Sequence, residues 1–312
     1  MHEKKGCFDE NVSVRLGSPG FRMTGAIRQA GPDQLAVLLP APRSLAASFP
    51  SHGDGNKLLT SGHLFVQGVG NLKVKLHRPL EGSVKTVSVK RENEHWYVCF
   101  SVECSVQPLP ESDAAVAIDV GLDAFATLES TNGEETPVEN PRFYRKMMAK
   151  LRRAQRRVAR RKKRSSRRRK AVVLLGKVHR QIFNQRNDYL HQAARPIVNK
   201  FGIIFVEDLN VKGLCGGMLS LSVHDAGWSY FISMLAYKAE EAGRRLVKVD
   251  ARGTSQRCPC GAQVRKKLSD REHVCTACGL LTTRDRASAM EILRLGLSLQ
   301  AQTKPEVKVS VA

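Results

Sequence analysis

Residues 116–130, VAIDVGLDAFATLES, predict a buried strand, a turn at Gly121 and a second strand. Two further apolar runs, GIIFVE at 202–207 and RRLVKVD at 244–250, predict additional strands. Between them, residues 228–242 place Trp, Phe, Ile, Leu and Ala side chains on one helical face. Strands that alternate with helices after an initial strand pair are typical of an α/β domain.

The segment between the first two of these apolar stretches is strongly basic. Residues 142–170, RFYRKMMAKLRRAQRRVARRKKRSSRRRK, are more than half Lys and Arg, and no acidic residue occurs between Glu139 and Asp188. A break near Ser165 predicts two long antiparallel helices. A solvated helix surface or a nuclear-localisation signal are alternatives, but uncompensated charge of this density favours nucleic-acid contact. The candidate contacts are Arg152, Arg153, Arg156, Arg157, Arg160 and Arg161.

Residues 64–106 alternate apolar with polar or basic residues and predict a small barrel or antiparallel sheet with a basic face. Lys75, His77 and Arg78 are candidate phosphate contacts, although an ordinary half-exposed sheet with basic edges explains the same pattern. Residues 1–55 lack sustained periodicity, so irregular structure, or the remnant of a larger module, is expected there.

The composition favours an anionic partner. Lys and Arg exceed Asp and Glu by 51 to 29, which gives a net charge of +22, and nucleic acid is the commonest partner of so basic a chain. The hydrophobic fraction of 42% suffices for a packed core. Apolar runs stay shorter than a membrane span and the first residues lack a secretory apolar region, so we expect a cytoplasmic, nucleoid-associated protein.

Four of the eight cysteines form two close pairs. Cys275 and Cys278 have the two-residue spacing and following glycine of a zinc knuckle. Cys258 and Cys260 are one residue closer than usual. We expect the four thiolates to hold structural Zn²⁺, and a ribbon folded around reduced thiols is the alternative.

Three acidic residues are candidate ligands for catalytic metal ions. Asp119 and Glu207 end apolar strands, and Asp285 begins a helix after the cysteine pairs. Converging carboxylates repel unless they hold cations, and oxygen ligands favour Mg²⁺ or Mn²⁺, two of which can promote phosphodiester hydrolysis. Spacing alone leaves open that each acid is a turn or cap residue.

Several segments occur in a fixed order between about residues 60 and 297. They are AIDVGLDAFATL, HRQIFNQRNDYLH, IIFVEDLNVKGL, DAGWSYFISMLAYKAEEAGRRLVKVD, TSQRC and RDRASAMEIL. Together they resemble TnpB, the transposon-encoded relative of type V CRISPR effectors. In this resemblance Asp119, Glu207 and Asp285 match the three catalytic acids.

The resemblance implies a fold and a function. The fold is α/β, with an RNase H-like (RuvC) nuclease domain, a β-barrel-like wedge domain and an inserted zinc ribbon. The function is RNA-guided cleavage of double-stranded DNA with Mg²⁺, leaving 5′-phosphate and 3′-hydroxyl ends. Partners are a guide RNA from the transposon end, the DNA target and a transposase.

The same resemblance divides the chain into domains. These are residues 1–55 (a divergent N-terminal segment), 56–112 (wedge-like), 113–250 (RuvC-like, with a basic helical insertion at 141–199), 251–281 (zinc ribbon), 282–298 (completing helix) and 299–312 (tail).

Three departures from the family pattern bear on function. The first 55 residues do not resemble the helical recognition module, Ala287 stands where the family tends to have Asn, and the first cysteine pair is short. A catalytically impaired RNA- and DNA-binding protein, such as a repressor or transposition accessory, is therefore the alternative, and a basic structural RNA-binding protein is a third hypothesis. Arg284 is expected either to contact the scissile phosphate or to pair with Asp285. Asp225 is expected to cap the helix that follows it rather than to bind metal.

Overall fold

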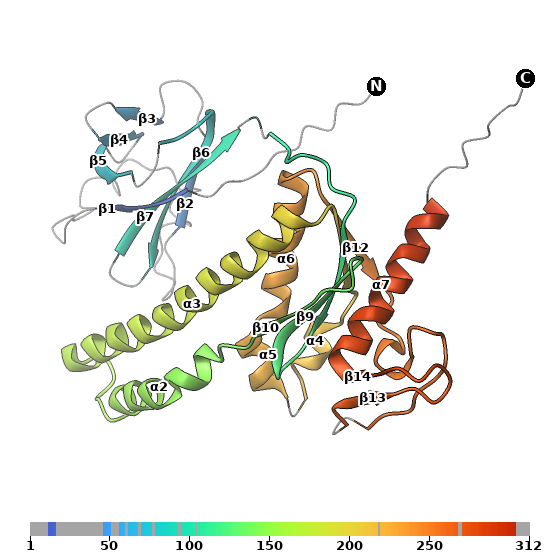
Figure 1. The fold of residues 1–312 in the computed structure, drawn as a ribbon. Helices are drawn as coiled ribbons and strands as arrows, with labels where there is room; N and C mark the ends of the chain where they lie inside the picture. The colour runs from blue at the N-terminus through green and yellow to red at the C-terminus, as the bar shows by residue number, and fades with distance from the viewer. Residues whose placement is uncertain are drawn as a thin grey trace, which may run out of the picture. The chain divides into compact units, whose positions relative to one another are not determined.

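The computed structural model is a mixed α/β protein. It describes residues 12–16, 46–50, 56–59, 62–67, 70–76, 79–92, 95–103, 105, 107–217, 219–267 and 270–303. The chain divides into two compact units, residues 1–105 with 162–177 and residues 106–161 with 178–312 (Figure 1).

The first unit contains an antiparallel sheet in the order β2-β6-β7-β1-β5-β4-β3. Its strands are β1 (Val12–Leu16), β2 (Ala46–Pro50), β3 (Asn56–Leu59), β4 (His63–Val66), β5 (Gly70–Lys75), β6 (Ser83–Glu92) and β7 (His95–Glu103). The antiparallel sheet predicted for residues 64–106 is confirmed by β4 to β7. Alternate residues of these strands, including Val66, Val98 and Phe100, form its apolar core.

Two strands of this sheet lie where the sequence predicted irregular structure. β1 pairs with β7, with Val12 beside Phe100, and β2 pairs with β6, with Phe49 beside Val87. The prediction of irregular structure was therefore wrong for these two segments. Their hydrogen-bond partners lie about 40 to 90 residues away in the chain, so local periodicity carries little information about them.

The second unit is built on a five-stranded sheet in the order β10-β9-β8-β11-β12. Its strands are β8 (Ala115–Val120), β9 (Ala124–Ser130), β10 (Glu135–Glu139), β11 (Ile203–Glu207) and β12 (Arg245–Val249). β8, β9 and β10 form an antiparallel meander, and β11 runs parallel to both β8 and β12. The predicted strand pair is confirmed, and its turn is closed by the Gly121 N–H, which donates to the Phe125 carbonyl at 3.1 Å.

The helices follow the sequence periodicity. They are α2 (Phe143–Ala159), α3 (Ser166–Lys200), α4 (Val211–Leu214), α5 (Ser220–Ala226), α6 (Trp228–Glu241) and α7 (Arg284–Thr303). The basic segment forms two helices, as predicted, with the break at residues 160–165. The apolar residues predicted to share one face of α6 include Trp228, Phe231, Leu235 and Ala239, and all four are buried.

The two faces of the five-stranded sheet are covered differently. One face packs against α5, α6 and the second half of α3 in a large apolar core that includes Ile118, Phe125, Leu190 and Phe231. The other face packs against α7 in a smaller apolar cluster. That cluster consists of Ala115, Ala117, Phe205, Val249 and Ile292.

A glycine lets α7 approach this second face closely. A Cβ atom on Gly296 would lie 2.2 Å from the ring of Phe205, so only glycine fits there. Between β12 and α7 the chain forms a short 3₁₀ turn, Thr254–Gln256, and a small antiparallel ribbon of β13 (Glu272–Val274) and β14 (Leu281–Thr283). None of the helices in the described part of the chain is long and apolar enough to cross a membrane.

Candidate functional site

Asp119 and Glu207 extend from the same face of the five-stranded sheet. Side chains alternate between the two faces along a strand, so Asp119 shares a face with Ala115 and Ala117, and Glu207 shares one with Phe205. These three apolar residues belong to the cluster under α7. Both carboxylates therefore lie on the α7 face.

The strand register brings the two carboxylates together. β8 and β11 run parallel, with Ile118 beside Val206. Continuing that register by one residue places Asp119 next to Glu207, on strands about 4.8 Å apart. Glu207 is the last residue of β11, so the pair lies at the carboxyl ends of two parallel strands, where an open α/β sheet presents its functional side chains.

The third predicted acid reaches the same corner from α7. Asp285 lies in the first turn of that helix, which packs against β8 and β9. Its Oδ2 lies 3.7 Å from the position that a Cβ atom on Gly121 would occupy, just beyond the end of β8. The structure thus brings Asp119, Glu207 and Asp285 to one end of the sheet.

The surroundings of Asp119 and Glu207 raise the pKa values of these two carboxyl groups. Burial raises the pKa of Asp119 well above its usual value, and the negative charges of Glu207 and Asp285 raise it further. The positive charges of Arg284 and Lys266 act in the opposite direction but do not reverse the shift. Burial also raises the pKa of Glu207. A cluster with such raised pKa values is short of positive charge, which a divalent cation would supply.

A hydroxyl that sequence reasoning missed fixes the second acid. Thr254, in the 3₁₀ turn after β12, donates a hydrogen bond to Oε1 of Glu207, and both side chains are buried. The same hydroxyl also contacts the Ala251 carbonyl at 3.2 Å. Thr254 therefore limits the orientations that the Glu207 carboxylate can adopt.

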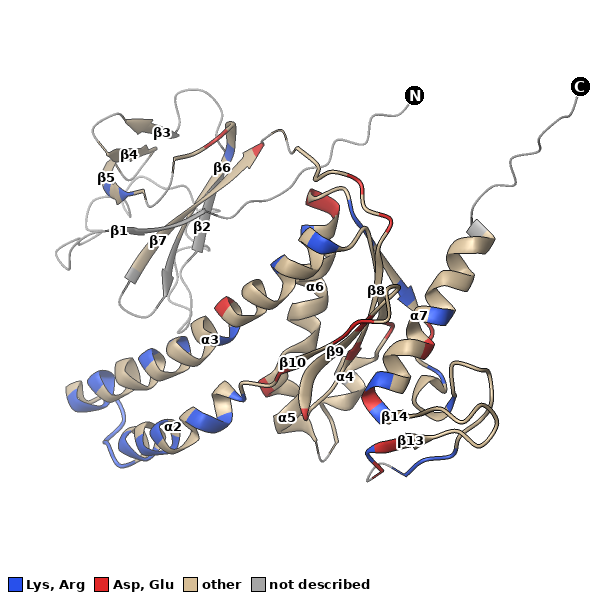
Figure 2. Ribbon diagram, viewed as in Figure 1, with Lys and Arg blue, Asp and Glu red and all other residues tan. Residues whose placement is uncertain are grey.

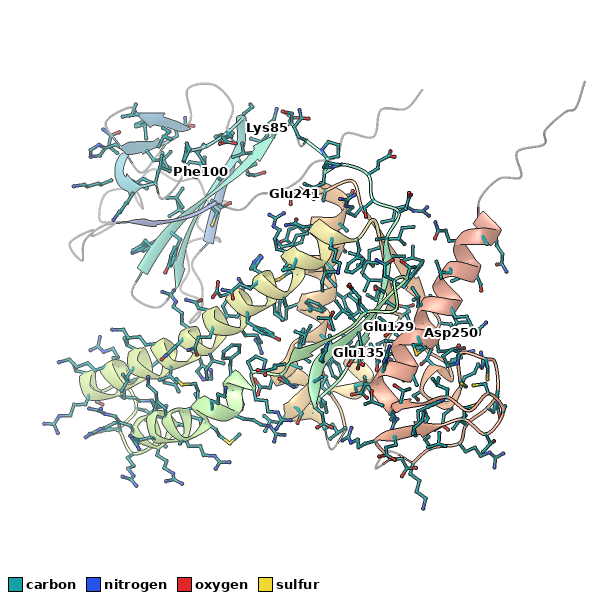
Figure 3. All side chains as sticks on the ribbon, viewed as in Figure 1. Lys85, Phe100, Glu129, Glu135, Glu241 and Asp250 are labelled. Carbon is teal, nitrogen blue, oxygen red and sulfur yellow. The ribbon has the colours of Figure 1, made fainter. Side chains whose placement is uncertain are left out.

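An arginine beside Asp285 ties α7 to the edge of the sheet. The Arg286 guanidinium lies 3.2 Å from Glu129 on β9 and 3.5 Å from Glu135 on β10, and it also contacts the Gly133 carbonyl at 3.4 Å. Glu129 and Glu135 are register partners, and Figure 3 labels both on neighbouring strands. Glu129 is only 3% exposed, so its charge depends on Arg286 for compensation.

Lys266 brings a positive charge to the cluster from the ribbon. Its backbone is held on both sides by the Gln256 amide, which accepts from the Lys266 N–H at 2.9 Å and donates to its carbonyl at 2.8 Å. The Lys266 ammonium lies 2.7 Å from Nδ1 of His273, which is fully buried. Burial and the nearby Arg284 charge lower the pKa of Lys266.

Arg284 was expected to contact either phosphate or Asp285. Its guanidinium donates to the Lys267 carbonyl at 3.0 Å, and its backbone N–H donates to the Arg271 carbonyl at 2.8 Å. These bonds attach the start of α7 to the ribbon, close enough to Asp119 for the Arg284 charge to lower the pKa of that carboxyl.

The four predicted zinc ligands form one cluster. Their sulfur atoms all lie within 4.8 Å of one another, with Cys258 3.6 Å from Cys278 and Cys260 3.7 Å from Cys275. Four thiolates around a tetrahedral zinc ion are separated by about 3.8 Å. A hydrogen bond from the Cys278 N–H helps to lower the pKa of the Cys275 thiol to about 7. The cluster is therefore consistent with a zinc site.

The turn that contains Cys258 and Cys260 resembles the turn that contains Cys275 and Cys278, although it is one residue shorter. In the second turn, Cys275 accepts from the N–H four residues later, and Gly279 has a φ of +76°. In the first turn, Cys258 accepts from the N–H three residues later, and Gly261 has a φ of +92°. The missing residue is thus absorbed by a tighter turn, and all four thiols still converge.

The structure describes most, but not all, of the residues that were predicted to contact nucleic acid. Arg152, Arg153, Arg156, Arg157, Arg160 and Arg161 line one groove of about 650 Å³ along α2 and the turn after it. Figure 2 shows that Lys and Arg dominate α2 and the start of α3. Lys75 ends β5 with an exposed side chain, whereas His77 and Arg78 lie outside the described residues.

Asp225 caps a different helix from the one expected. It lies within α5, and its carboxylate accepts the backbone N–H groups of Tyr144 at 2.8 Å and Arg145 at 3.2 Å. These residues begin α2, whereas the helix after Asp225 starts at Gly227 without a side-chain cap. Asp225 therefore caps a helix, as predicted, but the predicted helix was wrong. The helix that it caps lies 80 residues earlier in the chain.

Family models match most of the second unit and part of the first. A model of OrfB from IS605, described as a probable transposase, matches residues 87–216. A model of the Cas12f1-like TNB domain matches residues 228–292, which include the four cysteines and Asp285.

Curated relatives share much of the chain. A protein from Streptomyces pristinaespiralis named "Putative RNA-guided DNA endonuclease" is 37% identical over 237 residues, which are 74% of this chain and 58% of the relative. A protein from Escherichia coli K12 named "Putative RNA-guided DNA endonuclease InsQ" is 29% identical over 77% of this chain and 64% of its own length. The chain therefore spans about three fifths of the length of these relatives.

The fold is also similar to a solved structure. A chain of a cryo-EM structure of a Cas12f1–sgRNA–target DNA complex superposes with a TM-score of 0.53 and 16% identity, covering 80% of this chain and 59% of that one.

Proposed function

Because the chain belongs to the TnpB family, we propose that it is an RNA-guided, metal-dependent endonuclease that hydrolyses DNA at Asp119, Glu207 and Asp285. One observation carries the proposal. Three carboxylates from β8, β11 and the start of α7, far apart in sequence, converge on one face of the sheet. The antiparallel meander β10-β9-β8 with β11 and β12 added in parallel supports an RNase H-like, RuvC-type domain.

The donor set fits Mg²⁺ or Mn²⁺. The three carboxylates offer only oxygen ligands, and burial, together with the charges of Glu207 and Asp285, raises the pKa of Asp119. When bound, such ions supply charge stabilisation and a nucleophile at neutral pH for in-line attack on the phosphodiester. The protein's own contribution is to hold the ligands rigidly at the sheet edge.

Neighbouring residues give each ligand its orientation. Thr254 holds the Glu207 carboxylate by a buried hydrogen bond. Arg286 fixes the first turn of α7, and with it Asp285, against β9 and β10. Lys266 and Arg284 place positive charges near Asp119, where they favour its ionised form. Substrate phosphate would meet these two cations at the edge of the site.

The partners follow from charge and from the family. A guide RNA and a double-stranded DNA target carry the negative charge that a chain of net charge +22 requires. The arginine groove of α2 is the proposed phosphate contact. The four cysteines would hold Zn²⁺ in a structural role, since four protein ligands leave no open position for substrate.

The test is reconstitution with the natural guide. The chain is co-expressed with its flanking genomic DNA, the bound RNA is sequenced, and the complex is incubated with matched supercoiled DNA and Mg²⁺. We expect cutting that requires both the RNA match and Asp119, so that Asp119→Ala retains RNA but does not cut.

Metal content provides a second check. We expect one zinc per chain in the purified protein and its loss in Cys275→Ser, while Asp119→Ala keeps it. Bound RNA without cutting, under conditions in which a longer relative cuts, would contradict the nuclease assignment and leave a nucleic-acid-binding protein.

A further inference from the structure

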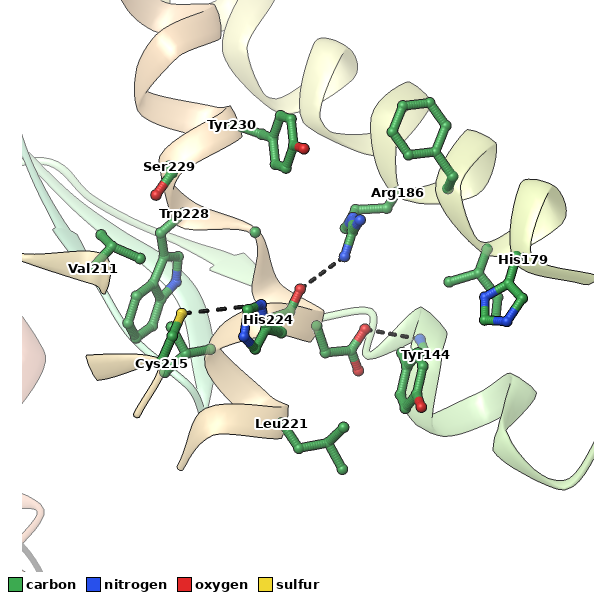
Figure 4. Close-up of a pocket in the computed structure, with 15 residues that line it drawn as sticks. Tyr144, His179, Arg186, Val211, Cys215, Leu221, His224, Trp228, Ser229 and Tyr230 are labelled. Atoms are coloured by element: carbon green, nitrogen blue, oxygen red, sulfur yellow. Dashed lines mark hydrogen bonds between the residues drawn. The ribbon is translucent and has the colours of Figure 1, made fainter. Parts of the chain in front are cut away.

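A second concave site lies on the face of the sheet opposite the three carboxylates. It is a pocket of about 740 Å³ within the second unit, lined by residues of α2, α3, α5 and α6 together with the segment around α4. Figure 4 shows side chains from these elements facing a common space. Its volume falls in the range of pockets that bind small planar ligands or single nucleotides.

Two aromatic side chains give this pocket a surface for stacking. Tyr230 on α6 is 56% exposed and Phe183 on α3 is 49% exposed, so both rings are accessible to a ligand. The Arg186 guanidinium lies 5.9 Å from the centre of the Tyr230 ring. Its Nη1 is also fixed by donation to the His224 carbonyl at 2.7 Å. The pocket therefore presents an aromatic ring and a positioned arginine side by side.

The floor of the pocket contains a polar group without a partner. Trp228 is 5% exposed, and its indole Nε1 has no hydrogen-bond acceptor among the described residues. Figure 4 also shows His224, whose Nδ1 lies 4.0 Å from Cys215 Sγ. This nitrogen is inaccessible to solvent, so the pocket offers a ligand the exposed ring of Tyr230 rather than this donor.

The charge around the pocket favours a polyanion. Tyr144 lines the pocket at the start of α2, and the arginine groove begins eight residues later at Arg152, about 12 Å along the helix axis. The acidic residue in the pocket, Asp225, is engaged by the backbone N–H groups of α2. A strand with its backbone on the α2 arginines would thus reach the pocket within a few nucleotides.

We propose that this pocket binds one unpaired base of the guide RNA by stacking on Tyr230, while the α2 arginines bind the neighbouring phosphates. The identity of the RNA as the guide rests on the proposed function. In that function the chain holds its guide before it meets a DNA target, so the guide is the strand available to a pocket that exists in the protein alone. On this ground the pocket is assigned to the RNA rather than to the DNA.

The test measures affinity for a fluorescein-labelled 12-nucleotide RNA of mixed sequence and for DNA of the same sequence. Tyr230→Ala should weaken RNA binding about tenfold, because the base loses the aromatic ring on which it stacks. Tyr230→Phe, which keeps the ring, and Tyr237→Ala, which removes a 40% exposed tyrosine of the same helix outside the pocket, should stay within twofold of the unaltered chain.

The salt dependence separates base contacts from phosphate contacts. Tyr230→Ala should leave the slope of log affinity against log salt unchanged, whereas Arg153→Ala with Arg157→Ala should reduce it by about 0.7 per lost phosphate contact. Unchanged RNA affinity in Tyr230→Ala would overturn the proposal. An equal or larger loss for the DNA would overturn the assignment to RNA. Binding is measured without cutting, so the result does not depend on whether the chain is a nuclease.

Discussion

The two faces of the five-stranded sheet are built from alternate residues of the same strands but differ in chemistry. The face under α5 and α6 is a continuous apolar core in which aromatic rings meet edge to face, as Phe125 and Phe231 do at 4.9 Å. The face under α7 combines a smaller apolar cluster with buried carboxylates, including Glu129, Glu207 and the fully buried Glu291. Stability and chemistry are thus assigned to opposite sides of one sheet.

The acids on the α7 face fall into two groups. Glu291 is paired with Arg294 at 2.7 Å and lies 3.8 Å from Arg257, and Glu129 is paired with Arg286. Asp119 faces two other carboxylates, and the net effect of its surroundings raises its pKa. The contrast teaches that structural acids of this site carry an arginine partner, whereas the candidate metal ligands are left in excess negative charge.

The largest expected effect comes from removing a charge on the α7 face. Asp285→Asn should reduce DNA cutting by on the order of 10⁴-fold, about 5–6 kcal/mol in the barrier, because one of three proposed metal ligands is weakened. Melting temperature should change little. Single-turnover cleavage with saturating guide RNA measures the rate of DNA cutting, and calorimetry measures the melting temperature. Cutting that survives Asp285→Asn would break the assignment of this face to chemistry.

The matching change on the other face should act on stability. Phe231 is fully buried in the apolar core, so Phe231→Ala should cost about 3–5 kcal/mol of unfolding free energy. Phe231→Leu, which leaves a smaller cavity, is the control and should cost less. Cutting per folded molecule should remain near normal in both. A denaturant titration gives the free energies, and a selective loss of cutting in Phe231→Leu would argue against separate roles for the two faces.

A third change tests whether Arg286 positions Asp285. Arg286→Ala leaves Glu129 buried without its partner and frees the first turn of α7, so cutting should fall about 10- to 100-fold. The apparent affinity for Mg²⁺ should weaken in the same variant, which a purely structural role would not produce. The double variant Glu129→Gln with Arg286→Gln should recover stability but not full Mg²⁺ affinity. Equal Mg²⁺ dependence in all variants would contradict a positioning role.

The smallest expected effect is a gain in the stability of the folded chain. Because the pKa of Asp119 is raised in the folded chain, folding favours its protonated form, and stability falls as pH rises from the ordinary value of 3.8 through the raised pKa. Asp119→Asn should remove this pH dependence and add about 0.5–2 kcal/mol at neutral pH without Mg²⁺. Thermal unfolding of the zinc-loaded protein at a series of pH values measures both the pH dependence and the gain in stability. A less stable Asp119→Asn would show that the acids do not repel.

Much of this arrangement could be predicted from local sequence. The strand containing Asp119, the strand ending at Glu207 and the start of α7 all follow from apolar periodicity, and alternation from Ala115 and Ala117 fixes the face that Asp119 occupies. The cysteine pairs were recognisable despite the short spacing, because a glycine follows each pair. These features are encoded within a few residues of one another.

The remaining features depend on long-range contacts. Arg286 meets Glu129 across 157 residues, and the only local signal was a charged residue within the buried strand β9. Thr254 reaches Glu207 across 47 residues. Asp225 had the residue type of a cap, but its target helix was set by packing rather than by adjacency.

The Asp225 cap also sets an order of events during synthesis. The N–H groups of Tyr144 and Arg145 emerge about 80 residues before the carboxylate that accepts them. At a synthesis rate of about 5–20 residues per second, roughly 4–16 seconds pass between synthesis of the start of α2 and synthesis of the residue that caps it. During that interval its arginines are presented on a helix with an unsatisfied start, beside the RNA of the ribosome and of any nascent transcript.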